Sequence, residues 1–193
     1  MTIIPRWEWR TFGESFGPAE ERFAALMPEK VEESTERYLL STRSPASAKI
    51  RGGLIDVKHL EAVNDDGLEL WLPVMQGAFP LPAADAASLL HELAMPPVPL
   101  DRAAYTLDQL IGEVVSPLPE LRAVDVHKRR THFTVSGAMS ELSELTVAAR
   151  RTRSIAVELD DPVVVISAVR ELGLADRPNT CMARVLKAVA APA

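Results

Sequence analysis

The alternation of hydrophobic and polar positions predicts two groups of β-strands along the chain. Successive residues of a strand point to opposite faces, so short aromatic or β-branched runs with a two-residue period are typical of strands. The first group is expected at residues 6–12, 35–43, 48–51, 54–63 and 68–75. The second group is expected at residues 121–128, 130–136, 141–149 and 154–159. Gly52-Gly53 and Asn64–Gly67 are typical of turns between neighbouring antiparallel strands.

Helical patterns lie between and after these strands. Pro18 suits the first turn of a helix, Asp161-Pro162 suits a helix start, and Gly173 suits a helix end. Helices are expected at residues 18–27, 83–94, 106–115, 162–172 and 179–190. The order strands, helices, strands, helices predicts an α+β protein whose antiparallel sheet is large enough to curl or close into a barrel with flanking helices.

Length and composition favour one folded domain over residues 1–193. The proline-containing segment 96–119 links the two strand groups, and neither group could bury both of its faces alone. With 47% hydrophobic and 25% charged residues, the composition is that of an ordinary globular protein. We therefore expect a single domain in which both strand groups belong to one fold.

Charge and residue usage exclude several classes of function. The formal net charge of −6 argues against a nucleic-acid-binding surface. No apolar run is long enough for a signal peptide or a membrane span, so a cytoplasmic protein is the default expectation. The one cysteine, Cys181, cannot form an intramolecular disulfide, and no Cys/His cluster has zinc spacing.

Positive charge is nevertheless concentrated in the predicted strands. Residues 34–58 contain five basic and two acidic residues, although the whole chain is negative. Charges two positions apart share a strand face, and the pairs are Lys49 with Arg51, Asp56 with Lys58, Lys128 with Arg130, and Arg151 with Arg153. Each pair is compatible with a solvated face. If the strands close around a cavity, their arginine and lysine side chains are suited to bind a phosphorylated small molecule.

An ordered series of short motifs then points to a known family. Arg6-Trp-Glu8-Trp-Arg10 stands where that family has Glu-x-Glu-x-Lys at its start. The later matches are Lys49-Ile-Arg51, Asp56-Val-Lys58, Lys128-Arg-Arg130, Glu141-Leu-Ser-Glu144 and Ala156-Val-Glu158. With this series the chain resembles the CYTH, or triphosphate tunnel, superfamily, which includes class IV adenylate cyclases, thiamine triphosphatases, and inorganic and RNA triphosphatases.

The resemblance implies a closed β-barrel, a tri- or polyphosphate ligand and a metal-dependent phosphatase activity. Basic side chains of such proteins bind the triphosphate, and carboxylates hold Mg²⁺ or Mn²⁺, which prefer oxygen ligands. Carried over to this chain, the expected phosphate ligands are Arg10, Lys49, Arg51, Lys58, Arg130 and Arg153. The expected metal ligands are Glu8, Glu144 and Glu158, and no catalytic residue is assigned.

Two departures from the family pattern leave two hypotheses. Arg6 and Ala156 stand where carboxylates are expected, and an arginine also adds a positive charge beside any metal ion. Glu8 is therefore compatible with a metal ligand or with an ion-pair partner of its arginine neighbours. One hypothesis is a divalent-metal-dependent phosphohydrolase. The other is a phosphate- or nucleotide-binding module that has lost its metal-ligating carboxylates.

Overall fold

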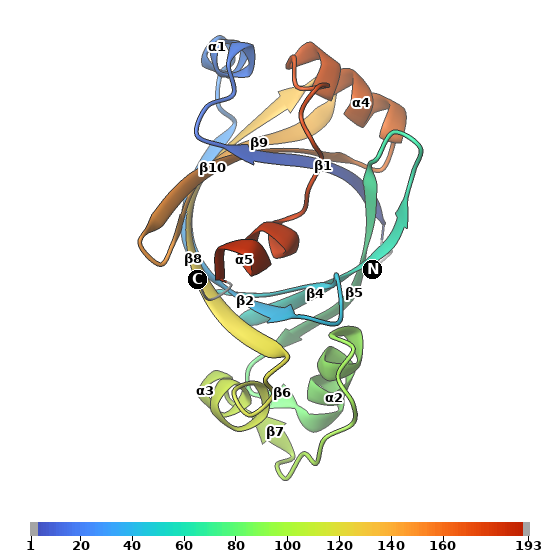
Figure 1. The fold of residues 1–193 in the computed structure, drawn as a ribbon, viewed down its shortest axis with the longest axis vertical. Helices are drawn as coiled ribbons and strands as arrows, with labels where there is room; N and C mark the ends of the chain where they lie inside the picture. The colour runs from blue at the N-terminus through green and yellow to red at the C-terminus, as the bar shows by residue number, and fades with distance from the viewer. Residues whose placement is uncertain (1–3, 191–193) are drawn as a thin grey trace. The chain divides into compact units, whose positions relative to one another are not determined.

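A computed structural model describes residues 4–190 of the chain, which contain eight main strands and several helices (Figure 1). The strands are β1 (Arg6–Gly13), β2 (Lys30–Ser41), β3 (Ser47–Arg51), β4 (Leu54–Val63), β5 (Glu69–Ala78), β6 (Leu81–Pro82), β7 (Ala104–Tyr105), β8 (Leu121–Val135), β9 (Ala138–Val147) and β10 (Arg150–Leu159). The helices are α1 (Pro18–Ala24), α2 (Ala83–Glu92), α3 (Leu107–Gln109), α4 (Pro162–Glu171) and α5 (Met182–Ala190), and a π-helix, Leu110–Val115, follows α3.

The main strands form a closed sheet. They are hydrogen-bonded in the order β1-β10-β9-β8-β2-β3-β4-β5, and β5 pairs with β1. Strands β6 and β7 form a separate two-stranded sheet. The predicted α+β fold with an antiparallel β-barrel and flanking helices is confirmed. None of the helices within residues 4–190 has the length and apolar character needed to cross a lipid bilayer.

Several predicted boundaries were wrong. Residues 121–128 and 130–136 form one strand, β8, because no turn residue interrupts the charged run between them. Strands β9 and β10 begin earlier than expected, at Ala138 and Arg150, since two-residue turns precede them. Helix α5 begins at Met182 instead of residue 179. The predicted cap at Thr106 is confirmed by a capping box with Gln109.

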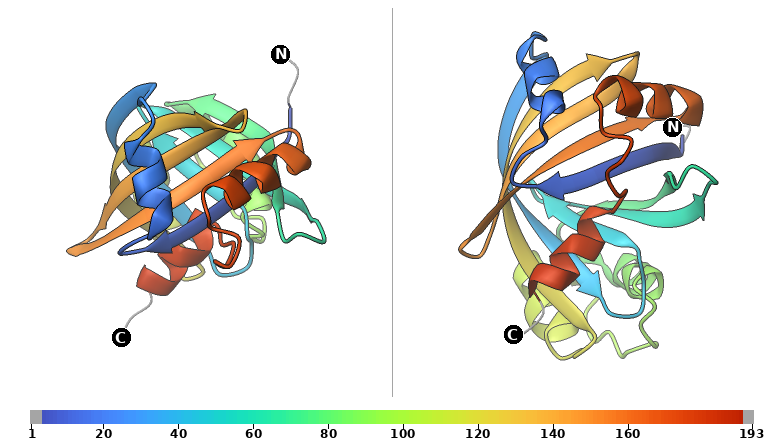
Figure 2. Two further views of the ribbon diagram at one scale, coloured as in Figure 1. Left: turned by 90° about the horizontal axis from the view of Figure 1, so that it is seen from above. Right: turned by 45° about the horizontal axis from the view of Figure 1, so that its top comes forward.

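Within residues 4–190 the chain folds as two compact units. The first unit comprises residues 4–35, 60–72 and 126–182. Its core joins strand residues such as Trp9 and Ile155 to Phe23 of α1 and Val165 of α4. Figure 2 shows α1 and α4 on the same side of β1, β9 and β10. The helices therefore cover one face of these strands, and Arg10 and Glu141 lie on the opposite face.

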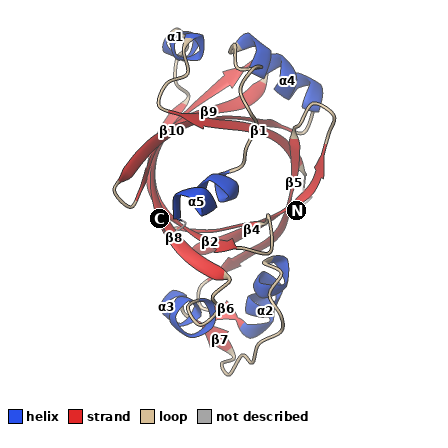
Figure 3. Cartoon of the chain, viewed as in Figure 1, coloured by secondary structure: helices blue, strands red, loops and turns tan. Residues whose placement is uncertain are grey.

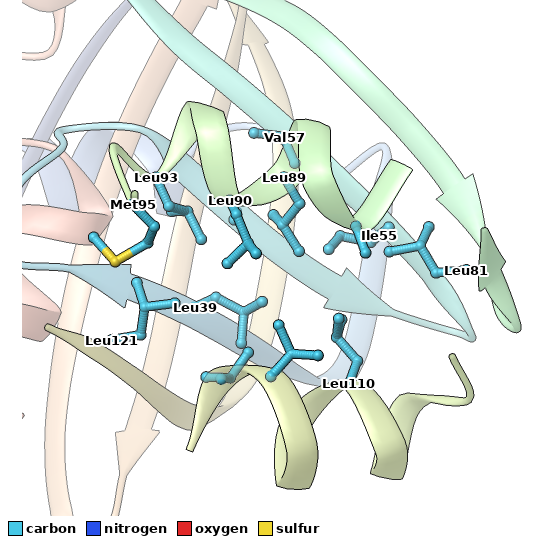
Figure 4. Packing of buried hydrophobic residues seen from close by; sticks show 14 of the residues in the cluster. Leu39, Ile55, Val57, Leu81, Leu89, Leu90, Leu93, Met95, Leu110 and Leu121 are labelled. Atoms are coloured by element: carbon cyan, nitrogen blue, oxygen red, sulfur yellow. The ribbon is translucent and has the colours of Figure 1, made fainter. Parts of the chain in front are cut away.

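The second unit comprises residues 36–59, 73–125 and 183–190. Helices α2 and α3 lie beside the β6–β7 sheet in this unit (Figure 3). Leu89 of α2 and Leu93, which follows α2, point toward Leu39 of β2, and Leu110 approaches from the π-helix (Figure 4). Burying such side chains stabilises the fold by about 1.5–3 kcal/mol each. As in the first unit, one strand face is apolar and helix-covered.

Two tight hairpin turns fix which residues share a face. Gly52 and Gly53 have φ of 57° and 75°, and Ser136 and Gly137 have φ of 50° and 87°. Two consecutive residues with positive φ form the turn whose twist matches antiparallel strands. Arg51 therefore pairs with Leu54 in one hairpin, and Val135 pairs with Ala138 in the other. Every residue pair further along each hairpin follows from these two pairs.

Candidate functional site

The first unit carries a charged surface on β1, β8, β9 and β10, which we call the first face. Arg10 of β1 pairs with Ala156 of β10, and Ala156 pairs with Glu141 of β9. Ser154 of β10 pairs with Ser143 of β9, and Ser143 pairs with Arg130 of β8. The first face consists of Arg6, Glu8, Arg10, Lys128, Arg130, Glu141, Ser143, Ser154 and Glu158.

Arg10 lies at the centre of the first face and contacts two carboxylates. Its Nε donates to Oε1 of Glu8 at 2.9 Å, and its Nη1 lies 3.7 Å from Oε1 of Glu141. Its Nη1 also donates to Oγ of Ser154 at 3.3 Å. Asn179 holds the backbone here, because its Oδ1 accepts from the Arg10 N–H at 2.7 Å. The guanidinium thus has hydrogen bonds or ion pairs with three residues, Glu8, Glu141 and Ser154.

Lys128 and Arg130 are the most buried cations of the first face. Their residues are 5% and 6% exposed, and Nη2 of Arg130 donates to Oγ of Ser34 at 3.0 Å. Burial raises the pKa of Glu141, but Arg10, the Ser143 hydroxyl and these two cations together bring that pKa below its usual value. The first face is therefore a network in which cations and carboxylates compensate one another.

The carboxylates of the first face do not fit a divalent metal ion. Glu8 accepts from Arg10, Glu158 accepts from Nη1 of Arg6 at 3.2 Å, and Glu141 accepts from the hydroxyl of Ser143 at 2.5 Å. Across residues 4–190, no group of three or more His, Cys, Asp or Glu side chains is arranged to hold a metal ion. Mg²⁺ and Mn²⁺ require several oxygen ligands at short distance.

Two predicted site residues lie on the opposite face of these strands. Arg153 pairs with Glu144, and Glu144 pairs with Arg129, so all three point away from the first face. Arg153 contacts Glu20, and its guanidinium lies 5.5 Å from the centre of the Phe16 ring. Glu144 and Arg153 line a cavity of about 650 Å³ that also includes His127, Arg129 and Arg151. This cavity is separate from Arg10, Arg130 and Glu8.

The second unit carries another charged surface, the second face, on β2, β3 and β4. Lys49 pairs with Tyr38 of β2 on one side and with Asp56 of β4 on the other. The alternation of the strands adds Arg51, Lys58 and Glu36 to the same face. The second face therefore contains the three basic residues that the sequence predicted for these strands: Lys49, Arg51 and Lys58.

A fully buried carboxylate lies among these cations. Glu36 is 0% exposed, and its Oε2 accepts from the Tyr38 hydroxyl at 2.8 Å. Nη1 of Arg51 is 3.5 Å from Oε1 of Glu36. Burial lowers the pKa of the half-buried Lys49, and the positive charges of Arg51 and Lys58 lower it further, while Glu36 and Asp56 act in the opposite direction. The charge of Lys49 is thus only partly compensated.

Sequence reasoning missed several residues of these surfaces. It selected Glu144 where the structure brings Glu141 to Arg10, and it did not select Lys128 or Glu36. The missed signal is the two-residue turn Ser136-Gly137. A turn predicted at Ser136-Gly137 fixes the residue pairs of the hairpin, which place Arg130 opposite Ser143 and His132 opposite Glu141.

Comparisons with known proteins show the fold but not a close relative. No family model matches the chain, and no curated protein is similar to it in sequence at a significant level. A candidate adenylate cyclase from Bacillus halodurans has a similar structure, with 10% identity and a TM-score of 0.57 over 96% of this chain and 98% of that chain.

Two further solved structures agree. A candidate adenylyl cyclase from Hippeastrum with a dominant triphosphatase activity has 13% identity and a TM-score of 0.54, covering 97% of both chains. A conserved hypothetical protein from Pyrococcus furiosus has 13% identity and a TM-score of 0.50 over 95% of this chain and 99% of that chain. The triphosphate-tunnel-like fold that the motif series implied is thereby confirmed.

Proposed function

We propose that this chain, which has the triphosphate-tunnel-like fold, binds a small anion that contains a tri- or polyphosphate group. The observation that carries the proposal is the second face, where Arg51 and Lys58 lie on the same face as the half-buried ammonium group of Lys49. Three cations on one strand face can each interact with oxygen atoms of successive phosphate groups.

The state of Lys49 supports an anionic ligand. A half-buried ammonium group loses hydration, and its charge is disfavoured by the neighbouring cations. Phosphate oxygens beside Lys49 would restore both the hydrogen bonds and the compensating charge. Arg51 adds a planar guanidinium that is suited to bidentate contact with phosphate. The second face is therefore suited to an anion.

On the first face, Arg10 and Arg130 remain proposed phosphate ligands, with Lys128 added. The charge of Arg10 is compensated by Glu8 and Glu141, so the proposal depends mainly on Lys49 of the second face. Arg153 is not included, because it lies on the opposite face with Glu20 and Phe16.

A second candidate function is hydrolysis of the bound polyphosphate with Mg²⁺ or Mn²⁺. The similarity in fold to the Hippeastrum protein with a dominant triphosphatase activity favours this activity. In this candidate, Glu8 and Glu158 would have to give up their arginine partners to hold the metal ion, which would polarise a phosphate group. Glu144 lies on the opposite face and is not included. The ion pairs of Glu8 and Glu158 make this the weaker candidate.

Calorimetric titration with tripolyphosphate, ATP and thiamine triphosphate tests the proposed function, with orthophosphate as the small-anion control. We expect saturable binding of at least one of the three and much weaker binding of orthophosphate, because fewer oxygens contact the cations. Binding of none of them would contradict the proposal. Phosphate release measured with and without Mg²⁺ or Mn²⁺ separates simple binding from hydrolysis.

A further inference from the structure

The carboxylates of the first face already have cationic or hydroxyl partners within the protein. Nη1 of Arg6 donates to Oε1 of Glu158 at 3.2 Å, and Nε of Arg10 donates to Oε1 of Glu8 at 2.9 Å. Glu8 and Glu158 are opposite one another on β1 and β10, so both arginines and both carboxylates lie in one small area. Each carboxylate is therefore neutralised by a guanidinium group.

This arrangement opposes a divalent cation for two physical reasons. The described residues contain no group of three His, Cys, Asp or Glu side chains suited to a metal ion, as a Mg²⁺ or Mn²⁺ site would need. A divalent ion at Glu8 or Glu158 would also approach the positive charge of Arg10 or Arg6, and the repulsion between such charges is large when they are partly shielded from water.

We propose that the protein binds the metal-free form of its polyphosphate ligand. On the first face, Arg6 and Arg10 supply the fixed positive charge that a bridging divalent ion supplies in metal-dependent phosphate sites. This inference rests on the proposed function, since it specifies the chemical form of the ligand. It makes the uncomplexed anion, and not its magnesium complex, the species that the protein recognises.

Titration of the wild-type protein with tripolyphosphate in EDTA and in excess Mg²⁺ tests the inference. We expect binding in EDTA and weaker apparent binding in Mg²⁺. If about nine-tenths of the ligand is magnesium-bound, the apparent affinity should fall roughly tenfold, because only the competent fraction binds. Binding that requires Mg²⁺ would overturn this inference and leave the proposed function standing. Absence of binding in both buffers would instead overturn the proposed function.

A second test uses Mn²⁺ alone and the variant Arg6→Glu, with Arg122→Glu as the control. Arg6→Glu adds a carboxylate beside Glu8, Glu158 and the buried Glu69 that pairs with Glu8, and it removes one guanidinium. Arg122 is exposed, and Arg122→Glu makes the same change in net charge. We expect Mn²⁺ to raise the melting temperature of Arg6→Glu but not that of the wild-type protein or of Arg122→Glu. Stabilisation of the wild-type protein by Mn²⁺ alone would contradict the inference. If Mn²⁺ does not raise the melting temperature of Arg6→Glu, the proposed role of Arg6 in excluding the metal ion is wrong.

Discussion

The first and second faces contain similar residue types but differ in how their charges are compensated. On the first face, Arg10 contacts both Glu8 and Glu141, and Arg6 contacts Glu158. On the second face, Lys49 is half-buried, and its pKa is lowered by burial and by the charges of Arg51 and Lys58. The first face is thus stabilised by its own ion pairs, whereas the second face retains a cation whose charge is disfavoured.

This difference shows why the number of basic residues alone does not identify an anion site. A guanidinium that already contacts two carboxylates must give up part of those interactions when a phosphate arrives. A desolvated ammonium with incomplete compensation gains hydrogen bonds and charge balance from the same ligand. Removing Lys49 should therefore mainly affect ligand binding, whereas removing Arg10 should mainly affect protein stability.

The largest expected effect is the loss of anion binding in the double variant Lys49→Ala, Arg51→Ala. Two charge-assisted hydrogen bonds contribute roughly 3–6 kcal/mol, so tripolyphosphate affinity should fall by more than about 100-fold. Calorimetric titration measures the change. The matched control is Arg37→Ala, because Arg37 lies on the opposite face and is paired with Asp125 at 2.6 Å. Equal losses in both variants would contradict the assignment of the second face.

The next effect is on stability. Arg10→Ala leaves Glu8 and Glu141 without their guanidinium partner on a surface where both side chains are less than one-fifth exposed. Breaking such a pair should reduce the free energy of unfolding by about 3 kcal/mol. Urea denaturation followed by circular dichroism measures this change.

The corresponding variant on the second face, Lys49→Met, should leave the stability unchanged or raise it by up to about 1 kcal/mol. It removes a charge that burial disfavours and keeps the apolar stem of the side chain. A loss of stability as large as that of Arg10→Ala would show that the two faces do not differ in charge compensation.

Anion binding should weaken as the pH rises. The lowered pKa of Lys49 means that its ammonium loses its proton earlier than an ordinary lysine, and a phosphate prefers the charged form. Affinity should fall as the pH rises through this lowered pKa. Lys49→Arg should remove the alkaline loss, since a guanidinium stays protonated. Binding titrations at several pH values compare the two proteins, and an identical alkaline loss in both would exclude Lys49 as its cause.

The smallest effect concerns Glu141 at acid pH. Burial raises its pKa, but Arg10, Ser143 and the nearby cations outweigh that effect, so its pKa in the folded protein lies below the unfolded value. The stability from Glu141 is present above the unfolded pKa and is lost as the pH falls through the lowered pKa. Glu141→Gln should remove this part of the acid dependence at a cost of about 1 kcal/mol at neutral pH. Melting temperatures across the acid range provide the measurement.

The hairpins explain which site residues the sequence could predict. Gly52-Gly53 marks its turn clearly, and the count back from that turn correctly groups Lys49, Arg51 and Lys58 on one face. Ser136-Gly137 is a weaker signal because a serine rarely has positive φ, and the predicted strands 130–136 and 141–149 left residues 137–140 between them. A one-residue change in register moves every side chain to the other face, and the acidic motif Glu141–Glu144 offers a carboxylate on each.

The sequence by itself determined the fold class, the order of the elements and the alternation of charge along each strand. These depend on local spacing, which hydrophobic periodicity and turn residues report directly. Only the tertiary structure decided that Arg10 contacts Glu141, that Arg153 lies with Phe16, and that Glu36 is buried beneath Tyr38. The first two contacts join residues far apart in the sequence, and the burial of Glu36 depends on neighbouring strands. Strand register and burial arise only when the whole sheet closes and its helices pack against it.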